Sequence, residues 1–413
     1  MEDDNMTIIE LFKNIKKAAQ NIVGDNLWNY GNYNNCIDYW CSVCPEFHKY
    51  FDVLFKNEYE DFVLLRYNEE AAYDNGYETI DEFWDVYEGL YRECRSVVID
   101  KKNECYVLRP FKKFFNMNQI EETSEENVRK MMDAAQSIEF SDKLDGSMQS
   151  ARWYNGKLVM AGSQSLDKNQ SYRLMYGLSM LNSNYIKMLK ANEDKTFIFE
   201  FIHHTDVHVV KYPNDKQGLY LIGVREVESG NEWSYKQILE ISKKYHIPTT
   251  EIFNTTLDEV LSSLDSKKSY EAEGFVINID GYKIKLKYND YVQIHKILKK
   301  IVSPNAIIRA IYDGTWDDLR SKIPESYKND ADITARYVFQ YIKQKKTAVS
   351  TAVDDIKINF NLKNRKDVFL YANNKYPTII HYIMCELYNK EYNFLRNAAG
   401  KFVKLKDIQR ALE

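Results

Sequence analysis

The chain has 413 residues, of which 44% are hydrophobic and 14% aromatic, so it can form two or three domains with sizeable cores. Its 56 basic and 61 acidic residues give a net charge of −5, which excludes a surface that is basic throughout but allows a local basic groove. The start of the chain lacks a basic segment followed by an apolar one, and no apolar run approaches a membrane span in length. We therefore expect a cytoplasmic protein without a signal peptide or membrane segment.

The N-terminal part begins with a predicted amphipathic helix over 7–23, where apolar residues recur at helical spacing. A cluster of possible metal ligands follows, C-x4-C-x2-C-x3-H, formed by Cys36, Cys41, Cys44 and His48. Buried thiols beside aromatic residues fit the same pattern, and a long chain without an export signal should keep its cysteines reduced. We assign no metal site to this cluster, and whether it binds zinc stays open.

The middle of the chain is a dense series of strand-like segments. Apolar and alternating runs predict strands over 61–68, 95–100, 105–110, 137–144, 148–155, 157–162, 196–202, 218–227, 273–279 and 282–288. Helical patterns lie over 79–94, 172–190 and 234–247. The dipeptides Asn155-Gly156 and Asp280-Gly281 predict two tight hairpins.

The pattern changes near residue 295, after which helical segments continue to residue 413. Ser303-Pro304 marks a candidate boundary, because such dipeptides favour turns. We predict an α+β fold of antiparallel sheets with flanking helices, followed by an all-helical C-terminal domain. The predicted parts are a helical extension over 1–50 that packs on a central domain over 51–300, and a helical domain over 301–413.

Lys143 stands out at the end of a predicted buried strand, in the stretch "SDKLDGS". A lysine in this place either extends its ammonium group to solvent or is held in a pocket as a nucleophile. The K-x-D-G pattern alone does not decide, because four common residue types match by chance in many chains.

Other charged residues favour the pocket. Glu200 lies inside the apolar strand "FIFEFI", where a carboxylate is costly to bury without a cation or a donor. Glu273 precedes a glycine at the head of another apolar strand. Lys283, Lys285 and Lys287 alternate along a strand and so share one face. Such a row of ammonium groups needs an anion against it, and the natural one is a phosphate.

The segment upstream adds groups that suit a purine nucleotide. Arg95 lies in "ECRSVVID", and Lys112, Lys113, Phe114 and Phe115 lie in "LRPFKKFFNMNQ". Cationic side chains can hold phosphates and an aromatic ring can pack on the base.

The ordered series R…KFFN…KLDGS…FEF…EGFV…KLKYNDY resembles that of the covalent nucleotidyltransferases, which include polynucleotide ligases and mRNA-capping enzymes. It is most similar to the RNA ligase 1 family, typified by the tRNA-repair ligase of T-even bacteriophage, over about residues 50–300. The resemblance implies an ATP-grasp-like nucleotidyltransferase domain and an ATP-dependent RNA ligase. Such an enzyme joins RNA 5′-phosphate and 3′-hydroxyl ends through a lysyl-AMP and an RNA-adenylate, in RNA or tRNA repair.

The resemblance also implies roles for single residues. Lys143 matches the lysine that becomes adenylated, and Lys285 and Lys287 match the paired catalytic lysines of the last motif. Glu200 and Glu273 match glutamates that handle the nucleotide and Mg²⁺, for which Mn²⁺ is an alternative. The other positions expected to bind the nucleotide are Arg95, Lys113, Phe115, Asp145, Gly146 and Tyr291.

The chain departs from the family at two motif positions, and its N-terminal extension of about forty residues, which includes the cysteine cluster, is also unmatched. Ala161-Gly162-Ser163 stands where the family has Lys-Gly-Ser, so one phosphate contact is missing or supplied elsewhere. The stretch after Glu200 lacks the usual Asn-Arg pair. It contains "HHTDVH", which we expect to be a loop or strand feature and not a metal site.

The chemistry needs Lys143 as a neutral amine, whereas an unperturbed lysine titrates at about 10.4. We expect Lys285, Lys287, a metal ion and partial burial to lower its pKa. Facing carboxylates raise that pKa unless Mg²⁺ neutralises them.

The expected partners are ATP, Mg²⁺ and single-stranded RNA ends, with a cleaved tRNA anticodon loop as one candidate. We expect a monomer, and the family favours a phage or other viral source and hence the host cytoplasm. A capping guanylyltransferase that uses GTP, or a DNA ligase, would share the lysine but should carry an OB-type barrel after the last motif. A non-catalytic RNA-binding protein is the third alternative, and the complete set of motif residues argues against it.

Overall fold

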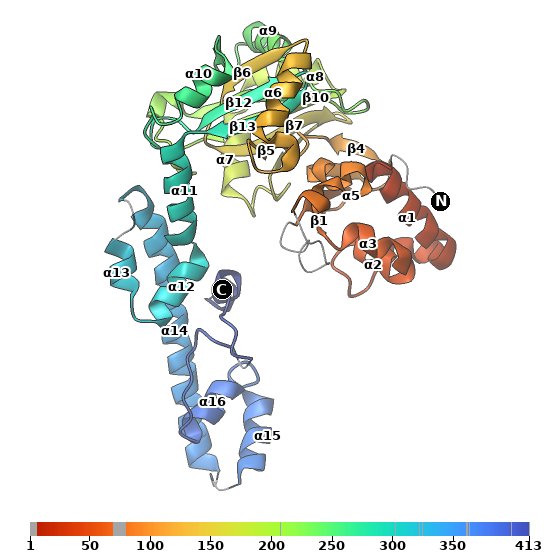
Figure 1. The fold of residues 1–413 in the computed structure, drawn as a ribbon. Coiled ribbons are helices and arrows are strands. Elements are labelled where there is room, and N and C mark those ends of the chain that lie inside the picture. The colour runs from red at the N-terminus through yellow and green to blue at the C-terminus, as the bar shows by residue number, and fades with distance from the viewer. Residues whose placement is uncertain are drawn as a thin grey trace. The chain divides into compact units, whose positions relative to one another are not determined.

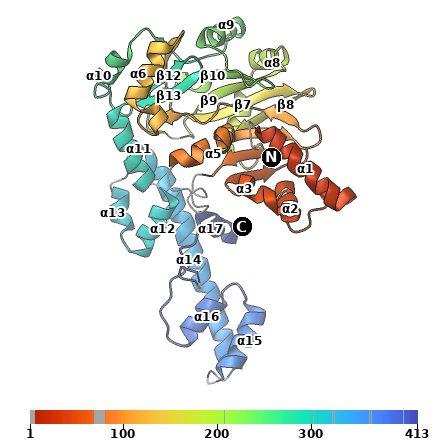
Figure 2. The same ribbon diagram turned by 45° about the vertical axis from the view of Figure 1, so that its right-hand side comes forward.

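The computed structural model describes residues 6–68, 80–206, 208–301, 303–321, 323, 325–360, 362, 364–397 and 399–412. The chain forms two compact units, Met1–Val292 and Gln293–Glu413 (Figures 1 and 2). The predicted α+β fold, with antiparallel sheets followed by a helical region, is confirmed. The predicted boundaries after residues 50 and 300 stay predictions.

The first part of unit one packs helices on an antiparallel sheet with the order β1-β2-β3-β4. The amphipathic helix predicted over 7–23 is confirmed as α1, which Thr7 and Glu10 cap reciprocally. Its buried face shares one apolar core with α2, α5 and the sheet. The elements are α1 (Ile8–Val23), η1 (Gly24–Trp28), α2 (Cys36–Val43), η2 (Pro45–Phe47), α3 (His48–Phe51), β1 (Leu54–Glu58), β2 (Phe62–Tyr67), α5 (Ile80–Glu93), β3 (Arg95–Asp100) and β4 (Cys105–Leu108).

A second antiparallel sheet has the order β10-β9-β7-β8. One of its faces is covered by helices, of which α8 and α9 lie beside it in both views of the ribbon (Figures 1 and 2). The aromatic residues of β9 form the centre of this core. The elements are β7 (Ser147–Tyr154), β8 (Lys157–Gly162), α7 (Tyr172–Met180), α8 (Ser183–Lys190), β9 (Lys195–Ile202), η4 (Asn214–Lys216), β10 (Gly218–Glu226) and α9 (Tyr235–Tyr245).

The third sheet has the order β11-β6-β12-β13-β5. All of its pairs are antiparallel except the short parallel contact between β13 and β5. It brings the end of β6 beside the start of β12, which positions the residues described below. The elements are β5 (Phe115–Asn116), η3 (Glu121–Thr123), α6 (Glu125–Ala134), β6 (Ile138–Asp142), β11 (Ile252–Phe253), α10 (Leu257–Ser262), β12 (Gly274–Ile279) and β13 (Tyr282–Lys287).

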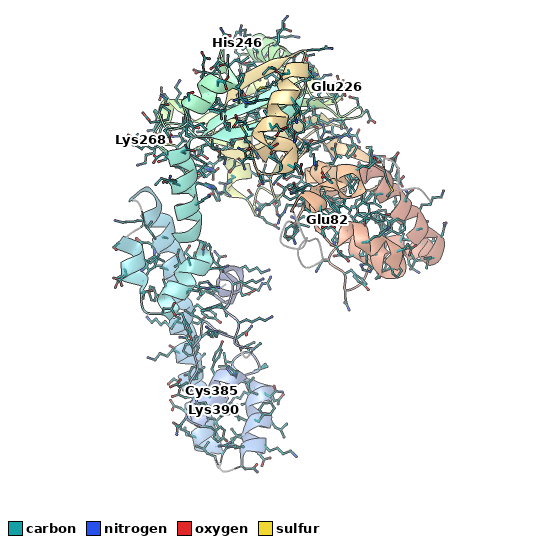
Figure 3. All side chains as sticks on the ribbon, viewed as in Figure 1. Glu82, Glu226, His246, Lys268, Cys385 and Lys390 are labelled. Atoms are coloured by element: carbon teal, nitrogen blue, oxygen red, sulfur yellow. The ribbon has the colours of Figure 1, made fainter. Side chains whose placement is uncertain are left out.

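The second unit, in its described residues, is helical apart from one isolated bridge between Arg396 and Phe402. Its main core joins α12, α14, α15, α16 and α17, and Cys385 on α16 is labelled in Figure 3. None of the described helices has the length and apolar character needed to cross a membrane. The elements are α11 (Asn289–Ile301), which begins in unit one, α12 (Pro304–Tyr312), α13 (Trp316–Ser321), α14 (Glu325–Asn359), α15 (Arg365–Lys375), α16 (Ile380–Leu387) and α17 (Leu405–Leu412).

Every strand predicted from the sequence has a counterpart, whereas β1, β5 and β11 were not predicted. The helix expected over 172–190 is two helices, α7 and α8. The continuous helix expected over 79–94 is wrong, because Tyr87, Glu88 and Gly89 have φ of 49°, 54° and 78° and break α5. Thr79 lies outside the described residues.

The cysteine cluster lies in the core of the N-terminal helices. Cys36, Cys41 and Cys44 are buried with free thiols. Burial raises the pKa of Cys41 to about 12, so the protonated form is strongly favoured. His48 is half-exposed and its Nδ1 faces Asp52 at 3.3 Å. These thiols therefore pack as small apolar groups.

Arg225 ties the second sheet to α5. It is 1% exposed, and its Nη1 and Nη2 donate to the two carboxylate oxygens of Glu93 at 2.9 and 2.7 Å. Its other donors reach the carbonyl oxygens of Pro110 and Gly230 at 2.7 and 2.8 Å. Burial works to raise the pKa of Glu93, but these hydrogen bonds and nearby cations hold it at about 2. Glu93 also pairs with Lys112 at 3.1 Å and with Arg109 at 3.6 Å, so Arg225 is the closest of three cations around this half-buried carboxylate.

Replacing this arginine should destabilise the first unit. We expect Arg225→Met to lower the free energy of unfolding by about 3 kcal/mol at pH 7, because Glu93 loses its two shortest charged hydrogen bonds and keeps only the contacts with Lys112 at 3.1 Å and Arg109 at 3.6 Å. The difference in the free energy of unfolding should have its full size above pH 4.5, the ordinary pKa of a glutamate. It should shrink as the pH falls toward 2, where Glu93 becomes neutral in the folded protein. Urea unfolding followed by tryptophan fluorescence at several pH values measures this.

Arg129→Met is the matched control, since Arg129 pairs with Glu125 and Asp258 at the surface. Exposed ion pairs contribute little to stability. Equal losses in the two variants, or a loss in Arg225→Met that does not change with pH, would contradict the role given to Arg225.

Candidate active site

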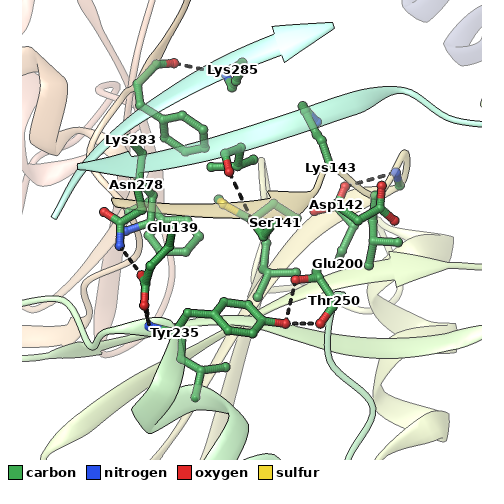
Figure 4. A pocket seen from close by; sticks show the side chains of 18 of the residues that line it. Glu139, Ser141, Asp142, Lys143, Glu200, Tyr235, Thr250, Asn278, Lys283 and Lys285 are labelled. Atoms are coloured by element: carbon green, nitrogen blue, oxygen red, sulfur yellow. Dashed lines mark hydrogen bonds between the residues drawn. The ribbon is translucent and has the colours of Figure 1, made fainter. Parts of the chain in front are cut away.

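A cavity of about 270 Å³ lies between residues of the second and third sheets, near the lower end of the range for small-molecule pockets (Figure 4). Strands β6, β7, β9, β12 and β13 contribute to it, and α9 closes one end. Of the residues predicted from the sequence, it is lined by Arg95, Lys143, Gly146, Glu200, Lys285 and Lys287.

Lys143 directly follows β6, and its backbone N donates to the carbonyl of Gly274 on β12 at 2.9 Å. Its side chain is 17% exposed, and Nζ donates to Glu273 Oε2 at 2.7 Å. The next turn is fixed by Gly146, whose N donates to Glu200 Oε1 at 3.0 Å. A Cβ on Gly146 would collide with the backbone oxygen of Phe201, so the close approach requires glycine. The lysine is therefore held in the cavity.

The three lysines of β13 line the cavity together, as the alternation predicts. Lys287 Nζ pairs with Glu273 Oε1 at 2.8 Å, and Lys283 pairs with Glu232. Lys285 Nζ donates to the backbone oxygen of Phe114 at 3.0 Å and lies 4.4 Å from the centre of its ring.

The site has strongly shifted titrations. Burial works to lower the pKa of Lys143, but the carboxylates of Glu273 and Glu200 outweigh it and raise this pKa above its usual value. Burial raises the pKa of Glu200 to about 7. Burial, and then the charges of Arg95 and Lys143, lower the pKa of Lys285 well below its usual value. The charged side chains of the cavity therefore do not neutralise one another in the free protein.

One end of the cavity is polar in a way that the sequence did not reveal. The backbone N of Tyr235 on α9 donates to the carboxylate of Glu139, and the Tyr235 hydroxyl donates to the backbone oxygen of Thr250. Asn278 Nδ2 donates to Glu139 Oε2 at 2.8 Å, while its Oδ1 is buried without a hydrogen-bond partner among the described residues (Figure 4). This unmet acceptor fits the amino group of a purine. In the sequence, only the alternation of residues along β6 and β12 could have indicated that Glu139 and Asn278 face the cavity.

Asp145 points away from the cavity into a hydrogen-bond network. Its Oδ1 accepts from the Tyr291 hydroxyl at 2.9 Å, and its Oδ2 accepts from the backbone N of Val210 at 2.9 Å. His208 lies between Asp145 and Asp206, at 3.4 and 3.0 Å. Burial works to lower the pKa of His208, but the two carboxylates raise it to about 10. The described residues of the "HHTDVH" stretch, 203–206 and 208, lie outside helices and strands, and His208 pairs with two carboxylates.

The upstream aromatic residues differ by one position from the prediction. Phe114 lines the cavity, while Phe115 is buried in the N-terminal core, because neighbouring residues of the extended segment point to opposite sides. Arg95 lies over Phe114, with its guanidinium carbon 4.9 Å from the ring centre. Lys113 lies outside the cavity, with Nζ 4.8 Å from the rings of both Tyr67 and Trp84.

The two predicted metal ligands differ in what surrounds them. Both oxygens of Glu273 accept from ammonium groups, so a cation there would lie against two positive charges. Glu200 lines the cavity, and its Oε1 accepts only a backbone N–H among the contacts described. Carboxylate oxygens suit Mg²⁺, which usually takes one or two from a protein. No group of three or more histidine, cysteine or acidic residues in the described part of the chain could hold a metal by itself. Glu200 therefore fits a metal shared with a phosphate ligand.

Comparison with known proteins agrees with this geometry. The family model described as RNA ligase matches residues 93–291, a range that contains every residue of the cavity. A protein of Autographa californica nuclear polyhedrosis virus, described provisionally as a bifunctional polynucleotide kinase/RNA ligase, is 23% identical over 248 residues, or 56% of this chain and 35% of that protein.

Solved structures of a Naegleria gruberi RNA ligase are also similar. The form with PPi has a TM-score of 0.33 and 17% identity over 41% of this chain and 55% of that one. A mutant with ATP and Mn has a TM-score of 0.36 and 17% identity over 45% and 57%. The chain thus spans about a third of the viral relative and little more than half of the Naegleria ligase. The match to the RNA ligase family model thus covers residues 93–291 of this chain, a little less than half of its length.

Proposed function

We propose that this chain is an ATP-dependent RNA ligase that joins RNA 5′-phosphate and 3′-hydroxyl ends. The observation that carries the proposal is Lys143 Nζ, held 2.7 Å from Glu273 in a cavity that Lys285 and Lys287 also line. A buried lysine beside a proton acceptor and further cations suits attack on a nucleotide phosphate. The match of residues 93–291 to the RNA ligase family model supports RNA as the polymer that is joined.

The proposed reaction has three transfers at one cavity. The neutral amine of Lys143 attacks the α-phosphorus of ATP, a P–N bond forms, and the P–O bond to pyrophosphate breaks. An oxygen of the RNA 5′-phosphate then attacks the same phosphorus, and the P–N bond breaks. Finally the 3′-hydroxyl of the other end attacks the 5′-phosphorus, and AMP leaves. The proton from Lys143 can pass to Glu273 Oε2, its hydrogen-bond partner.

In the free protein, the charges around Lys143 oppose the first step of the reaction, so bound ligands must change them. Lys143 is protonated, because Glu273 and Glu200 raise its pKa. A Mg²⁺ or Mn²⁺ ion at Glu200 would offset this pull and polarise the phosphate. We assign Glu273 the positioning of Lys143 and Lys287 in place of metal binding. Phosphate oxygens beside Lys285 would favour its charged form, which burial and the charges of Arg95 and Lys143 disfavour in the free protein.

The remaining residues shape the nucleotide site. We propose that Phe114 and Arg95 contact the nucleotide, with Lys113 and Phe115 behind them. Asn278 at the polar end is assigned the purine amino group. The other positioning residues are Asp145, Gly146 and Tyr291, which fix the turn after Lys143.

The natural substrate is proposed from the family resemblance. We propose single-stranded RNA ends, with a cleaved tRNA anticodon loop as one candidate, in RNA repair by a monomer in the cytoplasm of a phage-infected or virus-infected cell. A capping guanylyltransferase or DNA ligase is the second candidate. The described residues of the second unit are helical where those enzymes carry an OB-type barrel, which counts against both.

The first reaction step gives a direct test. Incubation with Mg²⁺ and α-labelled ATP should leave an acid-labile AMP adduct on Lys143, detected by denaturing gel and mass spectrometry. Lys143→Met should give no adduct, because the substitution removes the proposed nucleophile. Lys157→Met, at an exposed lysine of β8, should label like the unmodified chain. A GMP adduct would favour capping, and no adduct from protein free of bound AMP would refute the proposed mechanism.

The lysine row offers a second, matched test. Lys285→Met should slow adduct formation by about 100-fold, because it removes a positive charge from the place where negative charge develops on the phosphate. Lys283→Met should slow it by less than about tenfold, since Lys283 is already paired with Glu232. Single-turnover labelling at saturating ATP measures both rates. Equal effects of the two substitutions would contradict the roles proposed for the row.

A further inference from the structure

A second cavity lies next to the first. It measures about 330 Å³ and is lined mainly by polar side chains from β2, β7, the loop after β8 and the start of α7. Those that matter here are Arg66, Ser147, Ser163, Ser165, Tyr172 and Arg173, and we call this space the arginine cavity. Met148 lines both cavities, so the two are separated by the thickness of a single strand.

Arg66 lies in this cavity without a negative partner. Its Nε is buried and has no hydrogen-bond partner among the described residues, and its guanidinium carbon lies 3.7 Å from the centre of the Phe55 ring. Burial lowers the pKa of Arg66, and no carboxylate of the described chain counteracts it. A half-buried guanidinium in this situation is poised to bind an anion from outside.

The sheet register adds a second argument. Arg66 on β2 is the register partner of Arg95 on β3. The register shifts by one residue between Leu65 and Arg66, so a β-bulge lies at this pair. Arg95 lines the first cavity and Arg66 the second, so neighbouring positions of the two strands supply one guanidinium to each cavity.

The opposite wall supplies a cation and an aromatic ring. Arg173 is held by an ion pair with the buried Asp206 at 2.6 Å, yet its side chain is 46% exposed. Its guanidinium lies 5.0 Å from the ring centre of Tyr172, which is 45% exposed. Cationic groups for a phosphate beside an open aromatic face for a base are the features of single-strand recognition.

The departure from the family motif lies at the same place. Ala161 is fully buried in a small apolar core, so a phosphate contact cannot come from its side chain. The following Gly162 and Ser163 line the arginine cavity. The cations that line the cavity beside this position are Arg66 from β2 and Arg173 from α7.

We propose that the arginine cavity binds a phosphate of the RNA strand next to the end being joined, and that Tyr172 stacks on the neighbouring base. This inference rests on the proposed RNA ligase function. The pyrophosphate of ATP shares the phosphate chemistry, but it offers no base for Tyr172. RNA is therefore the ligand that the cavity fits.

Binding of a short RNA tests the cavity without catalysis. The probe is a fluorescein-labelled, 5′-phosphorylated single-stranded RNA of about 12 nucleotides, followed by anisotropy over a range of salt concentrations. Arg66→Gln should weaken binding by about tenfold and reduce the salt slope by about one. Tyr172→Ala should also weaken it by about tenfold, with an unchanged salt slope. The matched control Arg129→Gln, at a surface arginine of α6, should bind like the unmodified chain.

Two reactions then separate the possible sources of the phosphate. Sealing of pre-adenylated RNA without ATP should slow in Arg66→Gln, and Arg66→Lys should restore part of the rate. If Arg66→Gln slows AMP-adduct formation but binds RNA normally, the arginine cavity binds pyrophosphate and the inference is wrong. Normal RNA binding and normal sealing by Arg66→Gln would overturn it outright. Urea midpoints show whether each variant is folded.

Failure of the proposed function would look different. In that case the unmodified chain forms no AMP adduct and seals no RNA, whatever stands at position 66. The anisotropy measurement still decides whether Arg66 and Tyr172 bind RNA.

Discussion

The buried carboxylate of Glu273 organises this site. It is 3% exposed, and its two oxygens hold Lys143 from the loop after β6 and Lys287 from β13 at 2.7 and 2.8 Å. A buried charge is stable only if it is paired, and here one anion pairs with two cations that would otherwise repel each other. The same contacts join three neighbouring strands at the point where the chain leaves the sheet. The site lysines and the sheet register therefore depend on each other.

Around this pair the free protein keeps charges that do not balance. Among the described residues, Lys285 has no carboxylate partner and faces other cations, while burial raises the pKa of Glu200 to about 7. In the proposed reaction, a nucleoside triphosphate with a divalent ion would supply both missing signs, because its oxygens would face the lysines and the ion would face Glu200. These unbalanced charges lower the stability of the free protein and favour the binding of a ligand. Such a trade of stability for binding is common at functional sites.

Much of the fold was predictable because the strands of the first unit alternate clearly and the hairpins carry Asn-Gly and Asp-Gly turns. The lysine row was predictable for the same reason, since a period of two fixes the face of each side chain. The break in α5 was not, because Tyr87 and Glu88 adopt left-handed backbone angles that their residue types do not signal. The polar end of the cavity was missed because Glu139, Asn278 and Tyr235 meet only through tertiary packing. The nucleotide contact was predicted for Phe115 in place of Phe114, because two adjacent phenylalanines do not show in the sequence which ring faces the cavity.

The hairpin of β12 and β13 has a further consequence for how the site forms. Its turn is closed by Asp280 and Gly281, with φ of 47° and 94°, and its open end is closed by the pair of Gly274 and Lys287 beside Glu273. Contacts within one hairpin form early, because the loop to be closed is short. We therefore expect the spacing of the three lysines to be set by a local folding event, before the second sheet closes the cavity. One residue removed from the turn would shift the strand by one position and rotate the whole row to the other face of the sheet.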